Sequence, residues 1–357
     1  MLLSHIAFLL ALCVQQLASQ TAEEPITHND CSTNPTSLDY NLSMRIAGVF
    51  IVLVVSGLGI FSIILLGFNT NNATLAKILQ LLKMFGIGVI AATAWIHLLP
   101  EAFASFTNPC LSPTWAVYGP GFVGVFGLLS AYLVQLIELL AHNYMNHKHS
   151  NLKSKVDLFS QSNVNCNNEG NENQLTVASV IPKGHADEEH ATIEANSKVV
   201  TTIVLETGIL FHSLIIGLTL GVVDNDSFTI LLIAVSFHQF FEGMALGVLI
   251  GGLQSVKKVK KFLGLGLVYP LTTPLGIVIG ILIHKTYNEN IEGLILFNGI
   301  FESLSAGILF YNTYAELMSL EINNNLSFHG FSKFFKFLCF FSMYLGSAAM
   351  AIIGIWA

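Results

Sequence analysis

Eight apolar stretches, each long enough to cross a lipid bilayer, limit what this chain can fold into more than any other feature of its sequence. A membrane-spanning helix needs roughly 20 apolar residues. The composition agrees, because 53% of the residues are hydrophobic and only 10% are charged, against about 25% charge in soluble domains. We therefore predict an all-α membrane protein whose eight transmembrane helices cover approximately residues 45–67, 78–101, 117–141, 199–222, 228–251, 262–284, 292–318 and 334–356.

The distribution of basic residues predicts the orientation of these helices. Cytoplasmic loops of membrane proteins carry an excess of Lys and Arg. If the N-terminus lies outside, 13 of the 15 basic residues fall on the cytoplasmic side, and only Arg45 and Lys285 do not. Both termini are therefore expected on the extracellular or lumenal side. The net charge of −7 offers no basic face, so a nucleic-acid partner is excluded.

The chain divides into five segments. Residues 1–20 contain a short apolar run that is typical of a signal peptide, and residues 21–44 follow as an extracellular N-terminal segment. Residues 45–141 hold transmembrane helices 1–3, and residues 199–357 hold helices 4–8. The connection between them, 142–198, is rich in Asn, Ser, Glu and Lys. Such a composition cannot bury enough apolar surface to fold, so a disordered cytoplasmic loop is expected there.

Two external features follow from this orientation. Cys31 and Cys110 are both expected outside, where an oxidising environment permits a disulfide, and we hypothesise that they pair. Asn41-Leu42-Ser43 is an acceptable N-glycosylation site on the same side.

Four histidines of the cytoplasmic loop are candidates for metal collection: His147, His149, His185 and His190. The alternative is a solvated linker with scattered histidines. Their density is well below that of a His-x-His repeat, so the sequence leaves both interpretations open.

Charged groups within the apolar helices predict where the chemistry takes place. Each carboxylate at a helix centre costs about 2.5–3.5 kcal/mol, so six of them, unpaired at mid-depth, would cost on the order of 15–20 kcal/mol. Mutual pairing, a water-filled path or bound cations would offset that cost. Hydrogen bonding between helices is an equally good explanation for Glu138 and Glu302, and Glu101 could be solvated near the outer surface. The six are Glu101, Glu138, Glu206, Glu242, Glu302 and Glu316.

Histidines accompany these carboxylates at helical spacing. His238 and Glu242 are four residues apart, as are His97 and Glu101, so each pair shares one face of its helix. His212 lies in the fourth predicted helix. Neutral imidazole together with carboxylate suits Zn²⁺ and other divalent first-row metals. Because the pattern recurs in several helices, we predict that His212, His238 and Glu242 handle a metal ion.

At these residues the chain resembles the ZIP (ZRT/IRT-like) family of divalent metal transporters, in its fungal and plant branch. His212-Ser213-Leu214-Ile215-Ile216-Gly217 resembles the fourth-span signature of that family, and His238-Gln239-Phe240-Phe241-Glu242-Gly243 resembles the fifth. The resemblance extends over nearly everything from Cys31 on. Other similar segments are Phe85-Gly86, His97-Leu98-Leu99-Pro100-Glu101, Asn108-Pro109-Cys110-Leu111, Ser305-Ala306-Gly307-Ile308-Leu309 with Glu316, and Gly354-Ile355-Trp356-Ala357.

The resemblance implies eight spans with both ends outside, and import of metal toward the cytoplasm by alternating access between the fourth and fifth spans. It assigns the central ligands to His212, His238 and Glu242. It assigns the outer access to His97 and Glu101. The full set of pathway candidates is His97, Glu101, Glu206 and Glu316.

The sequence also departs from part of this family. Some relatives hold two metals with carboxylates at positions that are Ile216 and Thr273 here. We therefore expect one principal ion, with Ser213 and Gln239 as secondary or water-mediated contacts.

The function that these observations favour is uptake of zinc, as transported substrate and not as a resident cofactor, across the plasma membrane. Iron(II) or manganese(II) transport by the same family is the alternative. An alternative of another class is an intramembrane zinc metalloenzyme, but its best cue would be His-Glu-x-x-His. The sequence has His238-Gln239 with Glu242 and no adjacent general base, so we do not expect an enzyme. The metal ion and the bilayer are the expected partners, and the sequence leaves a homodimer open.

Overall fold

The structure, a computed structural model of the chain, describes residues 31, 40–67, 73–164, 183–252, 259–284 and 291–355. These residues form helices, with no strand among them. Within this part of the chain, eight helical stretches are long and apolar enough to cross a membrane, which confirms the predicted number. They are Leu42–Leu65, Thr74–Phe106, Gly121–Ala141, Thr202–Val222, Ser227–Ile250, Gly266–Ile283, Glu292–Asn323 and Lys333–Ile353.

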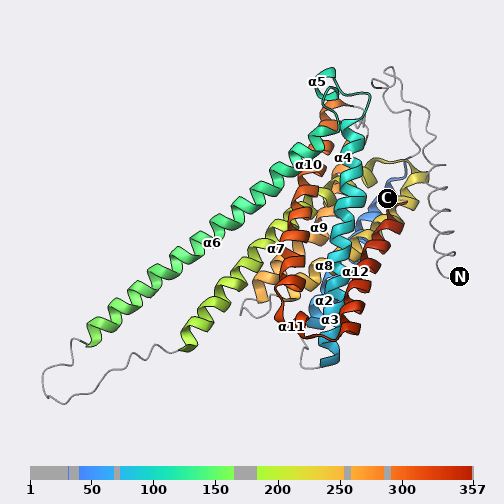
Figure 1. The fold of residues 1–357 in the computed structure, drawn as a ribbon. Coiled ribbons are helices and arrows are strands. Elements are labelled where there is room, and N and C mark those ends of the chain that lie inside the picture. The colour runs from blue at the N-terminus through green and yellow to red at the C-terminus, as the bar shows by residue number, and fades with distance from the viewer. Residues whose placement is uncertain are drawn as a thin grey trace, which may run out of the picture.

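The spans form one bundle, whose upper end in Figure 1 carries the C-terminal end of α4 and the short helix α5 (Pro113–Ala116). α2 packs on α8 and α9, α7 packs on α9, α3 packs on α12, and α10 packs on α6. α8 is the most buried of the eight spans. The helices concerned are α2 (Leu42–Gly67), α3 (Ala73–Ala92), α4 (Leu99–Phe106), α6 (Gly121–Val164), α7 (Lys183–Val222), α8 (Asn225–Gly252), α9 (Val259–Ile283), α10 (Glu292–Tyr311) and α12 (Lys333–Ile353).

Glycines allow α7 and α9 to approach closely. A Cβ atom on Gly217 would lie 2.3 Å from the carbonyl oxygen of Thr273, and one on Gly276 would lie 2.4 Å from the carbonyl oxygen of Leu214. Both distances are far below van der Waals contact. Small residues at such positions let the backbones of membrane helices meet directly. The close contact places Ser213, next to Leu214, near α9.

Two of the spans contain a wide, π-helical turn. In the second span this turn, η2 (Thr93–Leu98), joins α3 to α4, and Pro100 follows it at the start of α4. Proline has no N–H to offer the carbonyl four residues earlier, and its ring crowds that carbonyl, so the helix widens. The turn carries His97 in a buried position. The seventh span continues from α10 through two further turns of this kind, η3 (Asn312–Leu317) and η4 (Ser319–Asn323).

Residues that the charge pattern places outside meet at the start of α2. The ring of Tyr40 stacks on His284, with centroids 4.0 Å apart, and the Tyr40 hydroxyl donates to the carbonyl oxygen of Gly221 at 2.9 Å. Burial raises the pKa of Tyr40, an effect that the positive charge of Arg45 opposes. The hydroxyl therefore stays protonated at neutral pH and can donate. The guanidinium of Arg45, which is fully buried, donates to the carbonyl oxygen of Val223.

A disulfide joins Cys31 to Cys110, with 5.5 Å between the two Cα atoms. It links the segment before α2 to the connection between α4 and α5. Residues 1–30 and 32–39, which include the predicted signal peptide and most of the predicted N-terminal segment, lie outside the described residues.

The connection between the third and fourth spans differs from the expected disordered loop. α6 continues to Val164 and α7 begins at Lys183, and both extend away from the bundle (Figure 1). Residues 143–164 contain no Gly or Pro, so nothing in that stretch ends the helix although its polar side chains cannot form a core. Residues 165–182 lie outside the described residues.

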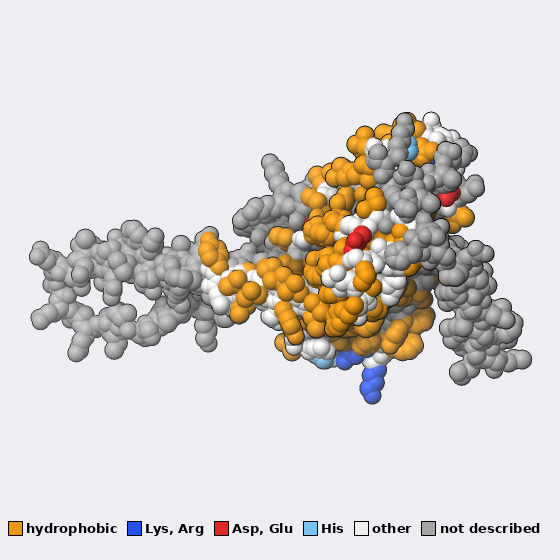
Figure 2. All heavy atoms as spheres, turned by 90° about the horizontal axis from the view of Figure 1, so that it is seen from above, with side chains coloured by type: hydrophobic (Ala, Val, Ile, Leu, Met, Phe, Trp, Pro, Cys, Tyr) orange, Lys and Arg blue, Asp and Glu red, His pale blue; other side chains and the backbone are white. Residues whose placement is uncertain are grey.

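Hydrophobic side chains cover much of the surface seen from above (Figure 2). Large apolar or aromatic residues are exposed on the outer helices, among them Phe50, Tyr132, Phe334 and Tyr344. An apolar surface of this extent would aggregate in water, whereas a bilayer covers it. The protein is therefore a multi-pass membrane protein.

Candidate metal site

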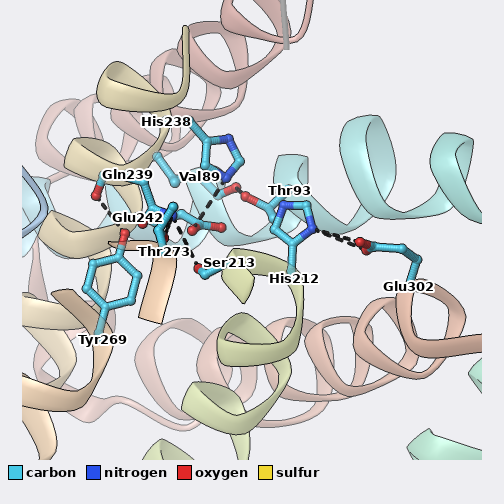
Figure 3. A network of polar contacts seen from close by, with 10 residues as sticks. All are labelled: Val89, Thr93, His212, Ser213, His238, Gln239, Glu242, Tyr269, Thr273 and Glu302. Carbon is cyan, nitrogen blue, oxygen red and sulfur yellow. Dashed lines mark hydrogen bonds and ion pairs between the residues drawn. The ribbon is translucent and has the colours of Figure 1, made fainter. Parts of the chain in front are cut away.

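The three side chains predicted to handle metal converge between α7 and α8. His212 is fully buried, and His238 and Glu242 are each 1% exposed. One ligand atom of each residue lies within 4.8 Å of the ligand atoms of the other two. His238 Nε2 lies 3.4 Å from Glu242 Oε2, and the rings of His212 and His238 have centroids 5.5 Å apart (Figure 3). With small side-chain adjustments, this spacing lets one divalent ion contact all three residues.

Neutral polar groups lie beside these ligands. The amide nitrogen of Gln239 donates to the Ser213 hydroxyl at 3.3 Å and also to the Thr273 hydroxyl. The hydroxyl of Tyr269 donates to the main-chain carbonyl oxygen of Gln239 at 2.6 Å. Ser213 and Gln239 therefore contact each other next to the ligands. Thr273 supplies a hydrogen-bond acceptor.

Many polar atoms of this cluster have no hydrogen-bond partner among the described residues. A buried polar atom without a partner costs about 1–3 kcal/mol, so a concentration of such atoms requires an explanation. Here the atoms belong to imidazole, amide and carboxylate groups, whose nitrogen and oxygen lone pairs first-row metals bind. They are Nε2 of His97, Nε2 of His212, both ring nitrogens of His238, Oε1 of Gln239 and both carboxylate oxygens of Glu242.

A second group of ligand atoms adjoins the first. The ligand atoms of Glu101, His212 and Glu302 also lie within 4.8 Å of one another. His212 Nδ1 is 3.1 Å from Glu302 Oε2, and Glu302 lies on the opposite side of His212 from Glu242 (Figure 3). His212 therefore belongs to both groups.

Glu302 was not among the site residues that the sequence predicted. Its only signal is a carboxylate in the middle of an apolar helix, and Glu138 has the same signal. In the structure Glu138 accepts a hydrogen bond from Tyr311 at 2.8 Å, whereas Glu302 contacts His212. The position of a carboxylate along its own helix does not distinguish these two outcomes.

A cavity of about 260 Å³ reaches both ligand groups. His97 and His238 face each other edge to face at one part of its wall, with ring centroids 5.0 Å apart. The cavity is also lined by Ser105 near the C-terminal end of α4 and by Asn298 in the N-terminal half of α10. Both of these helix ends lie at the upper end of the bundle (Figure 1). The polar lining of the cavity consists of His97, Glu101, Ser105, Thr219, His238, Asn298 and Glu302.

The other predicted residues lie apart from these ligand groups. Within the described chain, Glu206 and Glu316 belong to neither group. Glu206 is nevertheless buried on α7, and its Oε1 has no hydrogen-bond partner among the described residues. Asn41 is exposed at the start of α2. The side chains of His147, His149, His185 and His190 lie outside the described part of the structure.

Comparison with known proteins indicates the family to which the chain belongs. The family model described as ZIP Zinc transporter matches residues 42–354. Zinc-regulated transporter 1 of Candida albicans is 30% identical over 331 residues, which cover 92% of this chain and 64% of that protein, so the chain spans less than two thirds of that relative. Zinc transporter 3 of Oryza sativa subsp. japonica is 32% identical over 292 residues, or 77% of this chain and 78% of that protein. Zinc transporter 6, chloroplastic, of Arabidopsis thaliana is 31% identical over 322 residues, or 88% of this chain and 93% of that protein. The family match takes in all eight spans, and the chain therefore belongs to the ZIP zinc transporter family.

Proposed function

We propose that this protein transports divalent metal cations, zinc in preference, into the cytoplasm by alternating access through His212, His238 and Glu242. The observation that supports the proposal most is the convergence of these three buried residues from two neighbouring spans. Their nitrogen and oxygen atoms, most of which have no hydrogen-bond partner among the described residues, form a ligand set for a first-row metal inside a multi-pass membrane protein of a transporter family.

This ligand set suits a carrier better than a storage site. Structural zinc sites enclose the ion in four protein ligands and bind it tightly enough to stabilise a fold. Three strong ligands leave a coordination position for water, so the ion can be exchanged. Ser213 and Gln239 add only neutral oxygen atoms nearby, which hold a cation less strongly than a carboxylate does. One principal ion for each transport cycle is therefore our proposal.

The direction of transport follows from the orientation proposed for the chain. Residues that the charge pattern places outside, including Cys110 at the α4–α5 connection, lie at the upper end of the bundle, toward which the cavity extends. The cavity would then admit metal from outside, and closure above the ligands with opening below would deliver it to the cytoplasm. His97 and Glu101 line that access path.

The relatives support zinc and transport over the alternatives. The three relatives compared above are all named zinc or zinc-regulated transporters, which favours transport over an intramembrane metalloenzyme. We propose the plasma membrane as the location, although one relative is named chloroplastic. Iron(II) and manganese(II) stay alternatives, because affinity among first-row ions depends mainly on the metal itself. Competition of labelled zinc uptake by a panel of metals would distinguish them.

Metal uptake in cells that express the protein tests the proposed site. His212→Ala and Glu242→Ala should abolish zinc uptake, because each removes one of three strong ligands. His329→Ala is the matched control, since His329 is exposed on the short helix α11 (Leu326–Gly330) and its Nε2 lies 2.9 Å from the carbonyl oxygen of Asn323, away from the ligand groups. Normal uptake by a folded, membrane-located His212→Ala protein would refute the proposed site.

A further inference from the structure

We infer that Glu101, His212 and Glu302 form a second cation site, which binds the ion on its way from the cavity to His212, His238 and Glu242. We further infer that the two sites share His212 and are filled alternately. This inference rests on the proposed transport function and specifies how the ion reaches the central ligands.

The first step of the argument is the geometry of the second group. It joins three helices, with Glu101 on α4, His212 on α7 and Glu302 on α10. Glu302 is 1% exposed and His212 is fully buried, and the three ligand atoms lie within 4.8 Å of one another. Two ionised carboxylates held this close repel each other, and a positive charge between them relieves the repulsion. A proton can supply that charge, and so can a divalent cation, which would also bind the imidazole nitrogen.

The second step is the connection to the cavity. Glu101 and Glu302 line it, and so does His238 of the central group, so both groups face the same space. Ser105 lies one turn beyond Glu101 and Asn298 one turn beyond Glu302, on the side of the upper end, and both also line the cavity. Oxygen-bearing side chains therefore continue outward from the second group along two helices. An ion that enters this cavity can therefore reach both the carboxylate pair and the central site.

The third step concerns the shared histidine. A neutral imidazole has one nitrogen that accepts and one that carries a proton, so it offers a single lone pair. In His212, Nδ1 faces Glu302 at 3.1 Å, and Nε2 has no hydrogen-bond partner among the described residues. His212 can therefore complete one ligand group at a time. Sharing makes the two groups successive positions of one ion and does not produce a site for two ions.

The two groups also differ in chemistry. The second group has two carboxylates and one imidazole, whereas the central group has two imidazoles and one carboxylate. Carboxylates attract any divalent cation, while imidazole nitrogen favours zinc and its neighbours over hard ions such as magnesium or calcium. The carboxylate-rich group would then capture divalent cations with little selectivity. Transfer to the imidazole-rich group would be the step that selects zinc.

The second site can be tested by measuring, with equilibrium dialysis, how many zinc ions the purified full-length protein binds in detergent. The wild-type protein should bind one zinc ion. Glu242→Gln weakens the central group and should leave one weaker site, and adding Glu302→Gln should remove that residual binding. Adding Glu138→Gln in its place is the matched control, because Glu138 is also an intramembrane carboxylate but contacts Tyr311. An amide oxygen at position 302 can still accept a hydrogen bond from His212. If Glu302 only orients His212, Glu302→Gln should therefore leave the residual zinc binding unchanged.

Uptake measurements on the single variants complete the test. Glu101→Gln and Glu302→Gln should each lower zinc uptake at sub-saturating zinc by roughly tenfold or more, as loss of a metal-orienting group commonly does, while Glu138→Gln stays near wild type.

The inference fails if the Glu242→Gln protein binds no zinc, if its residual binding survives Glu302→Gln, or if the wild type binds two ions. If uptake depends on His212 and Glu242 but not on Glu101 or Glu302, this inference is wrong and the proposed function stands. If His212→Ala transports normally, the proposed function itself is wrong.

Discussion

The hydroxyl of Tyr269 on α9 donates to the main-chain carbonyl oxygen of Gln239 on α8 at 2.6 Å, and both residues are fully buried. The Gln239 side chain in turn donates to Ser213 on α7. A short chain of hydrogen bonds therefore fixes three helices relative to one another beside the proposed ligands. Glu242 is three residues after Gln239 on the same helix, so the position of its carboxylate depends on these contacts.

Removal of the Tyr269 hydroxyl should weaken this connection. Tyr269→Phe keeps the ring but deletes a buried hydrogen bond, so we expect the free energy of unfolding to fall by about 1 kcal/mol, with a higher KM for zinc. Thermal unfolding in detergent and initial uptake rates measure the two effects. Tyr144→Phe is the control, because Tyr144 is 71% exposed on α6. Equal behaviour of the two variants would show that the Tyr269 contact does not support the site.

Close packing of α7 against α9 gives a second prediction. Gly217→Ala places a Cβ atom 2.3 Å from the Thr273 carbonyl oxygen, so the helices must separate, and overpacking of this kind costs about 1–3 kcal/mol. We expect a lower unfolding temperature and reduced uptake, because Ser213 and Thr273 move apart. Gly124→Ala on α6 has no heavy atom within 4 Å of the added Cβ and should behave as wild type. A stable, fully active Gly217→Ala protein would contradict the α7–α9 packing described here.

Glycosylation at Asn41 tests the proposed orientation of the chain. Asn41 also has a structural role, and the two can be tested separately. The Asn41 side-chain oxygen accepts hydrogen bonds from the main-chain nitrogens of Ser43 at 3.1 Å and Met44 at 3.4 Å, so Asn41 caps α2. Ser43→Ala destroys the acceptor sequence but keeps the cap, so it should remove the glycan without changing thermal stability. Asn41→Ala should remove the glycan and also cost about 1 kcal/mol.

Protein made in a glycosylating host and treated with a glycosidase provides the measurement. The sequence Asn72-Ala73-Thr74 is expected on the cytoplasmic side, so Thr74→Ala should leave the mobility of the glycoprotein unchanged. A glycan at Asn72 and none at Asn41 would reverse the proposed orientation.

The fold could be predicted largely because the hydropathy of the sequence is sufficient to identify membrane spans. The number of spans needs no knowledge of tertiary contacts, since each apolar stretch must satisfy its own backbone within the bilayer. The limits of the second and seventh spans were harder to predict. They extend to Phe106 and Asn323, beyond the predicted 101 and 318, because helical structure continues through π-helical turns and past the apolar stretch.

The candidate site could be predicted only where its residues lie in recurring local patterns. His238 and Glu242 stand one helical turn apart, and that spacing alone indicates a shared face. Glu302 has no such partner on its own helix, and its contact with His212 depends on how α10 packs on α7. The helical extension of α6 to Val164 was missed because low apolar content argues against a core but does not forbid an isolated helix.

The disulfide between Cys31 and Cys110 should stabilise the external end of the protein. It closes a loop across 79 positions of sequence, and a disulfide of this kind typically contributes about 2–4 kcal/mol by restricting the unfolded chain. Cys31→Ser and Cys110→Ser should each lower the unfolding temperature. A reducing agent should lower the wild-type value to that of the variants and leave the variants unchanged. A wild-type protein that is insensitive to reduction, with both thiols free in a non-reducing mass map, would disprove the bond.

Acidification of the external medium should inhibit uptake by competition. A metal binds the deprotonated form of its ligands, and a proton on His212, His238 or Glu242 occupies the lone pair that the metal needs. As the external pH falls, KM for zinc should therefore rise while the maximal rate at saturating zinc changes little. His329→Ala should keep the wild-type profile, since this exposed histidine is not a ligand. Uptake that increases steadily toward acid pH would contradict competition, because protons would then assist the transport cycle and metal–proton symport would be the better account.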